Sequence, residues 1–373
     1  MAAPGAEGEG VDEGWSPDVR SDVALVQPPR RTAASANAVN SRDRARISSL
    51  RVALRILARV TAARCGLACV GAAPGKAGSM RTRTIGNDTV GRVTVGAIGL
   101  GLMTFDQSGS QPREQLADTI RAALDAGVTL FDTADAYGPG EELGAQTQGA
   151  NEQLIASLLD ELGVRDQVLL ATKGGHVRTE GGDWATDSSD AHLKEAVDAS
   201  LQRLGVEQIA LWQHHRPDPD VPYDDVIGSL KDIADSGKVR MIGLSNADPQ
   251  QIRAAHKVLG DALVSVQNQF SPAYRSSRPE IDVCEELGLA FLPWSPLGGL
   301  GEAKQLAEQH PAFADVAADR GVSPQQVALA WELAQSPVVI PIPGAKRPES
   351  IRDSAAAADL DLTPEELTRL DQS

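Results

Sequence analysis

Four residues in the middle of the sequence are of types that could move a proton together. Asp132, Lys173 and His215 each end a short apolar run, and they are 41 and 42 residues apart. Tyr137 lies five residues after Asp132. A phenol has a pKa of about 10, so it needs a nearby cation to favour its phenolate form. The four residues therefore predict acid–base chemistry in which a cation activates the phenol and a carboxylate holds the cation, while an imidazole orients a carbonyl group or helps to relay the proton.

Each of these residues also has a plain structural explanation when it is taken alone. An aspartate at a strand end commonly caps the next turn or helix, a lone lysine is commonly a solvated charge, and a lone tyrosine commonly packs. A histidine beside a proline turn is most often hydrogen-bonded within its loop. The chemical interpretation therefore requires elements that bring three consecutive strand ends together.

A repeating pattern predicts such elements, because short β-rich apolar runs alternate with segments of helical periodicity. The strand candidates are 97–103, 129–132, 168–172, 209–213, 240–244, 264–267, 290–293 and 338–342. The helix candidates are 113–126, 151–162, 192–204, 224–236, 249–258 and 324–334. Ser323 and Pro324 are typical of a helix start, and glycines such as Gly163 and Gly205 follow helix ends.

The strand candidates are apolar on both faces, which is typical of parallel strands covered by helices. Eight β/α units in roughly 250 residues predict a (β/α)8 TIM barrel, whose functional side chains lie at the carboxyl ends of the strands. The alternative is an open doubly wound sheet with a G-x-G-x-x-G turn after its first strand. The sequence Gly-Leu-Gly-Leu-Met-Thr over 99–104 lacks the third glycine, so a single-domain α/β barrel over residues 80–373 is favoured.

Residues 1–79 differ in character from the rest of the chain. Their opening is rich in Gly, Ala, Glu and Asp, and a later arginine-rich stretch has apolar residues at helical spacing. Because this segment is poor in core-forming sequence, we expect a disordered tail. Two interpretations stay open: a targeting extension, which the early acidic residues disfavour, and a start assigned too far upstream, with Met80 as the natural first residue.

Composition limits the partners of the chain. Its 373 residues carry a net charge of −16, which repels phosphate backbones and anionic lipid, so neither nucleic acid nor membrane is an expected partner. An anionic cofactor would need a local basic pocket. The three cysteines, two of them within residues 1–79, indicate a reducing, cytoplasmic location. The sequence does not predict an oligomeric state.

Six motifs follow one another between Arg81 and Leu370: Phe131-Asp-Thr-Ala-Asp-Ala-Tyr-Gly138, Ala171-Thr-Lys-Gly174, Gln213-His-His-Arg-Pro-Asp218, Ile242-Gly-Leu-Ser-Asn246, Val266-Gln-Asn-Gln269 and Pro293-Trp-Ser-Pro-Leu-Gly298. In these motifs the chain resembles the aldo-keto reductases, close to the bacterial oxidoreductase branch. The resemblance implies a catalytic tetrad and no metal: Asp132, Tyr137, Lys173 and His215. His215 is preferred over His214 because the family's histidine directly precedes the Arg/Trp-Pro step.

The resemblance also implies a nicotinamide cofactor across the barrel mouth. Three residues correspond to those that bind its carboxamide: Ser245, Asn246 and Gln267. Trp294 corresponds to an aromatic residue that stacks on the nicotinamide ring. Three more would line the pyrophosphate, where small residues let backbone N–H groups approach: Ser295, Leu297 and Gly299.

The segment after the last strand candidate adds a basic site. Gly344 begins a turn that enters a helix, and Lys346 and Arg347 beside it would form an anion site with the helix N-terminus. This site favours NADP(H) over NAD(H), since it suits a 2′-phosphate. Whether Lys346, Arg347 or Arg352 meets that phosphate stays open. Three further positions correspond to the family's phosphate- and adenine-binding residues: Ser350, Asp353 and Ser354.

Together these residues predict an NADP(H)-dependent oxidoreductase that reversibly reduces an aldehyde or ketone to an alcohol, with Tyr137 as general acid/base. Two alternatives stay open: a non-catalytic NADP(H)-binding regulatory subunit, and a barrel lyase or hydrolase that uses Lys173 as a Schiff-base amine. Specificity depends on the loops 138–149 and 176–189, in which Trp184 is a candidate substrate contact. The sequence ends soon after its last helix, which predicts an open pocket.

Overall fold

The computed structural model describes residues 80–105, 111–138, 147–179, 183–299 and 301–373. The predicted disordered tail over 1–79 lies outside these residues, as does most of the predicted substrate loop 138–149, so both stay predictions. The division of the chain at residue 80 stays a prediction for the same reason. No helix in the described ranges is long and apolar enough to cross a membrane.

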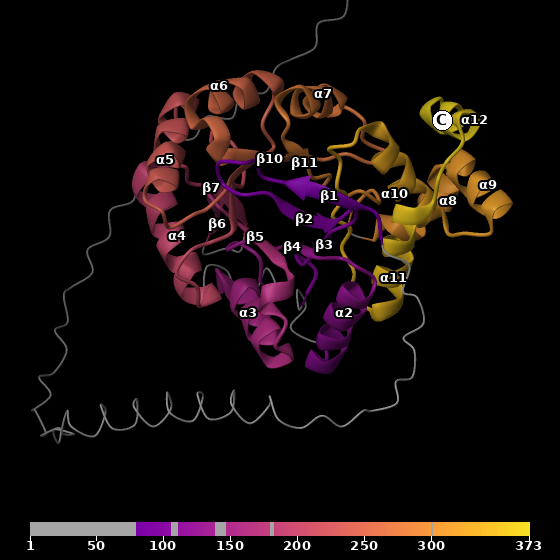
Figure 1. The fold of residues 1–373 in the computed structure, drawn as a ribbon, viewed down its shortest axis with the longest axis horizontal. Helices are drawn as coiled ribbons and strands as arrows, with labels where there is room; N and C mark the ends of the chain where they lie inside the picture. The colour runs from indigo at the N-terminus through magenta and orange to yellow at the C-terminus, as the bar shows by residue number, and fades with distance from the viewer. Residues whose placement is uncertain (1–79, 106–110, 139–146, 180–182, 300) are drawn as a thin grey trace, which may run out of the picture. The chain divides into compact units, whose positions relative to one another are not determined.

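Seven parallel strands form the central sheet and pair in chain order. They are β3 (Leu100–Gly101), β4 (Leu130–Asp132), β5 (Leu169–Gly174), β8 (Leu211–His214), β9 (Ile242–Ser245), β10 (Leu263–Gln267) and β11 (Ala290–Phe291). Neighbouring strands of this kind are joined by right-handed β/α crossovers. Figure 1 shows the helices arranged around the strands, which are buried on both faces.

Residues 338–344 supply the eighth pairing and close the sheet. On one side this segment pairs with β11, where the amide of Phe291 donates to the Val338 oxygen and the amide of Ile340 donates to the Phe291 oxygen, both at 2.9 Å. On the other side it pairs with the β3 segment, with a parallel bridge between Gly101 and Gly344. The sheet is therefore a cylinder, and the predicted (β/α)8 barrel is confirmed.

Two prolines make the eighth segment irregular. The amides of Gly99 and Gly101 donate to the oxygens of Pro341 and Pro343 at 2.8 and 3.0 Å. Proline has no N–H, so neither proline can donate a bond in return. Residues 338–342, predicted as a regular strand, therefore pair through separate bridges.

Helices between the strands form the outer layer. The longer ones are α2 (Arg113–Asp125), α3 (Ala150–Leu162), α4 (Asp190–Leu204), α5 (Tyr223–Asp235), α6 (Pro249–Leu259), α7 (Arg278–Leu287), α9 (Pro311–Arg320), α10 (Pro324–Gln335), α11 (Pro348–Ala356) and α12 (Pro364–Asp371). The short ones are α8 (Leu306–Gln309) and the 3-10 turns Arg165–Gln167, Gly260–Ala262, Glu302–Lys304 and Ala357–Asp359. As predicted, Ser323 caps α10 by accepting the Gln326 amide, and Gly163 and Gly205 end α3 and α4 in the left-handed region.

An antiparallel hairpin that the sequence did not predict precedes the barrel strands. β1 (Thr82–Ile85) pairs with β2 (Val93–Gly96), and Figure 1 shows both in indigo inside the ring of helices. Ile85 and Val95 belong to the same buried cluster as Leu130 and Leu211, which begin strands β4 and β8. The hairpin therefore covers the amino ends of the strands and leaves their carboxyl ends accessible.

A second hairpin follows β5, where the sequence predicted only a loop. β6 (His176–Arg178) pairs with β7 (Trp184–Thr186). Two other differences from prediction are the first barrel strand, which spans only Leu100–Gly101, and α7 and α9, which were not among the predicted helices. All three-residue and shorter strands carry little periodicity, so their bounds are the least predictable.

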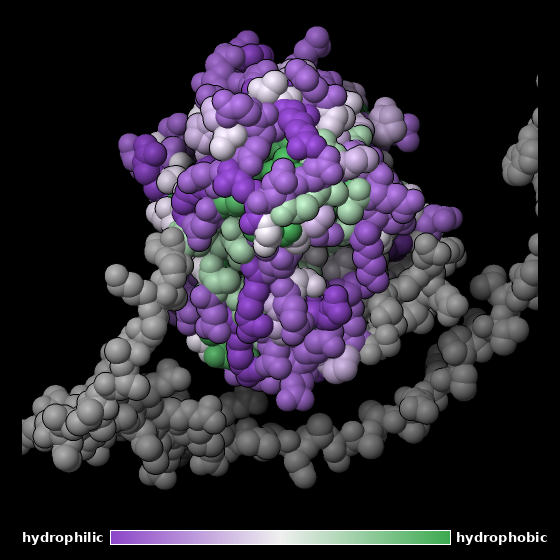
Figure 2. All heavy atoms as spheres, turned by 90° about the vertical axis from the view of Figure 1, so that its right-hand side faces the viewer, coloured by the Kyte–Doolittle hydropathy of each residue, from purple (hydrophilic) through white to green (hydrophobic). Residues whose placement is uncertain are grey.

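The face of the barrel over the C-terminal helices is largely hydrophilic, as Figure 2 shows, with a narrow band of more apolar side chains across it. Exposed ion pairs contribute to this polar surface, such as Arg320 with Glu366 at 2.7 Å. The apolar side chains of the same helices point inward, since Phe313, Trp331 and Leu370 are all buried. Among the described residues, this face therefore offers no apolar site for a ligand comparable to the accessible carboxyl ends of the strands.

Candidate active site

A cavity of about 1090 Å³ opens at the carboxyl ends of the strands. It is lined by most of the residues that the sequence singled out: Asp132, Tyr137, Trp184, His215, Ser245, Asn246, Gln267, Trp294, Ser295, Leu297, Gly299, Gly344 and Lys346. Cavities that hold drug-sized ligands measure about 300–1,000 Å³. This one therefore has room for a large ligand, or for a ligand and a small co-substrate.

Lys173 lies directly below the cavity and is fully buried. Its Nζ donates to Asp132 Oδ2 at 2.6 Å, to the Thr133 oxygen at 2.9 Å and to the Tyr137 hydroxyl at 3.0 Å. These bonds use all three hydrogens of the ammonium group. Burial alone would lower the pKa of Lys173, but Asp132 and Tyr137 hold it above its ordinary value.

Tyr137 is buried and lines the cavity. Burial raises the pKa of the phenol above its ordinary value, and the positive charge of Lys173 opposes that rise. The phenol is therefore protonated at neutral pH. A protonated phenol held beside an ammonium group can donate a proton to a developing alkoxide.

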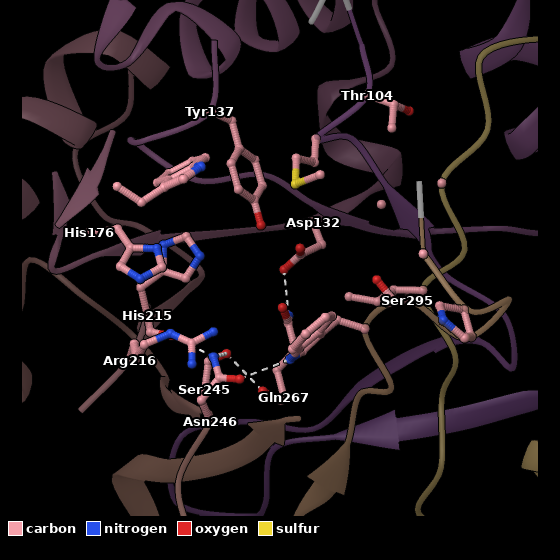
Figure 3. Close-up of a pocket in the computed structure, with 18 of the residues that line it drawn as sticks. Thr104, Asp132, Tyr137, His176, His215, Arg216, Ser245, Asn246, Gln267 and Ser295 are labelled. Atoms are coloured by element: carbon pink, nitrogen blue, oxygen red, sulfur yellow. Dashed lines mark hydrogen bonds between the residues drawn. The ribbon is translucent and has the colours of Figure 1, made fainter. Parts of the chain in front are cut away.

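The second oxygen of Asp132 is held by two amides, as the close-up in Figure 3 illustrates for Gln267. Asp132 Oδ1 accepts from Gln213 Nε2 at 2.9 Å and from Gln267 Nε2 at 2.8 Å. Gln267 Nε2 also lies 3.3 Å from Gln213 Oε1. Both hydrogens of the Gln267 amide are thus used inside the barrel, so only its oxygen is left to meet a carboxamide in the cavity.

Gln213 was not among the predicted site residues, although it is buried and bonded to the tetrad. Asp132, Gln213 and Gln267 come from alternate strands of the barrel, which is how side chains of one interior layer are arranged. Gly243, on the strand between them, leaves the space that they occupy, because a Cβ there would come within 2.7 Å of the Gln213 side chain. The alternation of strands is the signal that could have identified Gln213 from the sequence.

A row of four rings, here called the ring wall, extends from the phenol along one side of the cavity. Ring centroids are 5.6 Å apart between Tyr137 and His215, 4.1 Å between His215 and His176, and 5.4 Å between His176 and Trp184. Burial lowers the pKa of His215 well below its usual range, and Lys173 and His176 lower it further. Burial and the nearby arginine Arg216 lower the pKa of His176 to about 4. Both imidazoles are therefore neutral at pH 7.

His214 faces away from this row. Its Nε2 lies 2.8 Å from Ser188 Oγ, and burial lowers the pKa of the ring to about 4. The expectation that His215, rather than His214, lies beside the phenol agrees with this geometry. The bond from His214 therefore holds Ser188, in the loop that precedes α4. The Ser188 amide also donates to Asp218, which holds the same loop.

Asn246 joins three elements at the cavity. Its Nδ2 donates to the His215 oxygen and to Ser245 Oγ, both at 3.0 Å, and its Oδ1 accepts from Trp294 Nε1 at 3.2 Å. Asn246 has a φ of 58° and Ser295 a φ of 51°, a left-handed conformation that is uncommon outside glycine. Such strain is concentrated at binding sites, where the surrounding contacts hold it in place.

The other end of the cavity is formed by backbone and basic side chains. Gly298, Gly299 and Gly301 have φ between 88° and 130°, and at these three positions no side chain of their own covers the backbone. Lys346 lines the cavity just before α11, and its amine makes no bond to any other described residue. Four predicted residues do not line the cavity: Arg347, Ser350, Asp353 and Ser354.

Asp353 is engaged elsewhere in the described structure. Its carboxylate accepts from Ser323 Oγ at 2.7 Å and from Gln326 Nε2 at 2.6 Å, at the start of α10. Its predicted role at the adenine stays a prediction. The cavity residues that the sequence did not name as site residues include three with ionisable side chains, His176, Arg178 and Arg216. The first two lie in the predicted specificity loop 176–189.

Comparison with known proteins agrees with this geometry. The model of the aldo/keto reductase family matches residues 97–373. An uncharacterised oxidoreductase of Schizosaccharomyces pombe is 33% identical over 279 residues, covering 74% of this chain and 85% of its own. The 6-dehydroglucose reductase of Novosphingobium aromaticivorans is 36% identical over 267 residues, covering 70% of this chain and 85% of its own.

Two solved structures from Klebsiella pneumoniae share the fold. An aldo/keto reductase in complex with NADP and acetate has a TM-score of 0.63 and 27% identity, covering 75% of this chain and 92% of that chain. An aldo-keto reductase in complex with NADPH has a TM-score of 0.64 and 26% identity, covering 79% of this chain and 95% of that chain. The chain belongs to the aldo/keto reductase family.

Proposed function

We propose that this protein is an NADP(H)-dependent oxidoreductase that reversibly reduces an aldehyde or ketone to an alcohol. The observation that carries the proposal is the bridge made by Lys173, whose Nζ lies 2.6 Å from Asp132 and 3.0 Å from the Tyr137 hydroxyl at the edge of the cavity. A carbonyl group reduced in this cavity must receive a proton on its oxygen. The bridge provides a protonated phenol at that place.

Tyr137 donates the proton in the direction of reduction. The Lys173 ammonium stabilises the phenolate that forms, and Asp132 holds the ammonium in position. His215, which is neutral, orients the carbonyl oxygen toward the phenol through its ring N–H. In the direction of oxidation the same phenolate accepts the proton of the alcohol.

The residues around the cavity suit a phosphorylated dinucleotide. Asn246 and Ser245 present amide and hydroxyl groups, Gly299 and Gly301 present backbone without side chains, and Lys346 presents an amine with no partner among the described residues. These groups would hold the carboxamide, the pyrophosphate and the 2′-phosphate, respectively. When bound, the cofactor supplies the hydride. The two related structures that hold NADP or NADPH support this assignment.

The two alternatives are less well supported. A Schiff-base enzyme needs a lysine amine that can reach the substrate as a free base. Lys173 is fully buried, its three hydrogens are bonded and its pKa is raised. A purely regulatory subunit would not need the tetrad, which is complete here.

The test is the oxidation of NADPH, followed by absorbance, with a panel of neutral aldehydes and ketones. We expect turnover by the wild-type protein and a loss of several orders of magnitude in Tyr137→Phe, with NADPH affinity unchanged. Tyr274→Phe, an exposed tyrosine outside the cavity, is the matched control. Binding of NADPH without turnover of any carbonyl compound would support the regulatory alternative, and borohydride trapping on Lys173 would support the Schiff-base alternative.

A further inference from the structure

The charges that line the cavity do not follow the charge of the chain. The chain carries −16, yet the charged residues described in the lining are three cations and one acid: Arg178, Arg216, Lys346 and Asp132. Asp132 is already neutralised by Lys173 at 2.6 Å. Lys346 lies at the end assigned to the cofactor phosphate. The other two cations of the lining, Arg216 and Arg178, belong to the part of the cavity where the substrate must lie.

Arg216 directly follows His215, beside the tetrad. In Figure 3, His176, His215 and Arg216 lie on one side of Tyr137 and Asp132, and Ser295 lies on the other. Arg216 is exposed to the cavity and makes no ion pair or hydrogen bond within the described part of the chain. A guanidinium group without a carboxylate partner at a cavity wall is ready to bind an anion in bidentate fashion.

Arg178 stands at the outer end of the ring wall. It is paired with Trp184 across the β6–β7 hairpin, and its Cζ lies 3.4 Å from the centre of the Trp184 ring. Stacking on the indole fixes the plane of the guanidinium group. The ring wall thus runs from the phenol that protonates the carbonyl to a fixed cation at the cavity mouth.

We propose that the substrate is a carbonyl compound with an anionic group, a carboxylate or a phosphate, that binds Arg216 and Arg178 along the ring wall. This inference rests on the proposed function and names its substrate class. His176 lies between the two arginines and is neutral, so it adds a hydrogen bond and no charge. The local cations also offset the repulsion that an acidic protein exerts on an anionic substrate.

Matched compounds separate charge from shape. For the carboxylate we compare 4-oxobutanoate with its methyl ester, and for the phosphate we compare glyceraldehyde 3-phosphate with glyceraldehyde, all with NADPH. We expect kcat/KM of one charged compound to exceed that of its neutral partner by about tenfold or more, as for hydrogen bonds to charged groups. The preference should shrink as ionic strength rises.

Three variants assign the preference to the arginines. Arg216→Gln and Arg178→Gln should each lower kcat/KM for the charged compound by about tenfold, mainly through KM, and change the neutral compound by less than about twofold. Arg216→Lys should retain part of the preference. Arg253→Gln, an exposed arginine on α6 paired with Glu286, should change neither value.

Calorimetry provides a readout that does not depend on turnover. With NADP⁺ present, 4-hydroxybutanoate should bind more tightly than butane-1,4-diol, and Arg216→Gln should remove the difference. The proposal is overturned if charged and neutral compounds are treated alike, if the preference survives both arginine substitutions, or if Arg216→Gln weakens NADPH binding instead. Failure of every carbonyl compound, neutral ones included, would refute the proposed function, and the calorimetric comparison would still decide the anion site.

Discussion

Gln213 Nε2 donates to Asp132 Oδ1 at 2.9 Å inside the barrel, across 81 residues of sequence. The bond stabilises the carboxylate whose other oxygen holds Lys173. Gln213→Leu keeps a similar volume but removes the donor. We expect kcat to fall about tenfold to a hundredfold, since hydrogen bonds to charged groups contribute about 1.5–3 kcal/mol, while the Kd for NADPH stays nearly constant. Gln208→Leu, which loses an exposed bond to the Gly237 oxygen, is the control and should retain wild-type kcat.

A companion variant, Gln213→Glu, places a second carboxyl group beside Asp132. Two carboxylates at this distance repel each other, so the pair would share one proton. Asp132 would then carry less negative charge and would bind the Lys173 ammonium less strongly. We expect a larger loss of kcat than in Gln213→Leu and partial recovery toward acidic pH. A pH profile identical to that of the wild type would contradict this view of the network.

The basic residues around the start of α11 should decide between the two nicotinamide cofactors. Lys346 lines the cavity, whereas Arg347 and Arg352 do not, so Lys346→Gln should raise the Kd for NADPH the most, by about tenfold. The Kd for NADH should change little, because NADH has no 2′-phosphate. Fluorescence titration of the three single glutamine variants measures both constants. If all three variants bind NADPH with the wild-type Kd, the 2′-phosphate does not bind in this part of the protein.

Asn246 allows the role of a side chain to be separated from that of the backbone. Asn246 has a φ of 58°, which glycine adopts without strain. Asn246→Gly therefore keeps the backbone conformation and loses the side-chain bonds to His215, Ser245 and Trp294. Asn246→Ala loses the same bonds and also adds backbone strain of about 1–2 kcal/mol. Both variants should weaken NADPH binding to a similar extent, and the alanine variant should have the lower Tm. A glycine variant with unchanged NADPH affinity would show that the amide does not position the nicotinamide site.

The rate of carbonyl reduction should depend little on pH near neutrality. In the proposed mechanism the acid form of Tyr137 donates the proton, and its raised pKa keeps it protonated until pH exceeds about 10. His215 and His176 have lowered pKa values, so neither gains a proton until the solution is well below pH 6.5. We expect kcat for reduction to be flat between about pH 6 and 9. A kinetic pKa between those limits would mean that another group donates the proton.

His214 should make the protein less stable in acid. Its pKa is about 4 in the folded state and 6.5 in the unfolded state. Between these values the unfolded chain binds the proton and the folded one does not, so the free energy of unfolding falls by roughly 3 kcal/mol from pH 6.5 to 4 through this group. His214→Gln keeps a partner for Ser188 and does not titrate. Urea unfolding at both pH values should show a smaller loss for the variant than for the wild type.

The sequence predicted that Asp132, Tyr137, Lys173 and His215 lie together, because three of them follow apolar runs whose ends a closed barrel brings to one rim. The structure brings the four side chains together, and their catalytic roles stay a prediction. Helix ends were also predictable, since Gly205 and Ser323 occupy positions that demand those residue types. Gln213 was overlooked because a neutral amide within an apolar strand has no charge to signal a site. It is identified only once the alternate strands of the barrel are considered together.

The β6–β7 hairpin could not be predicted from its sequence. Its strands have three residues each, too few for periodicity to distinguish them from a loop. His176 and Arg178 were therefore expected only as parts of the specificity loop 176–189, and neither was named as a site residue, although both line the cavity. The contact of His176 with His215, 4.1 Å between ring centres, depends on tertiary packing that a linear pattern does not contain.

Pro341 and Pro343 give the cylinder one incomplete joint, where hydrogen bonds run in a single direction from Gly99 and Gly101. The chain leaves this joint through Gly344 and reaches Lys346 within a few residues. A dinucleotide bound by Lys346 would therefore stabilise the barrel at this joint. Cofactor binding would then also raise the free energy of unfolding of the barrel, because a ligand that binds only the folded state stabilises it.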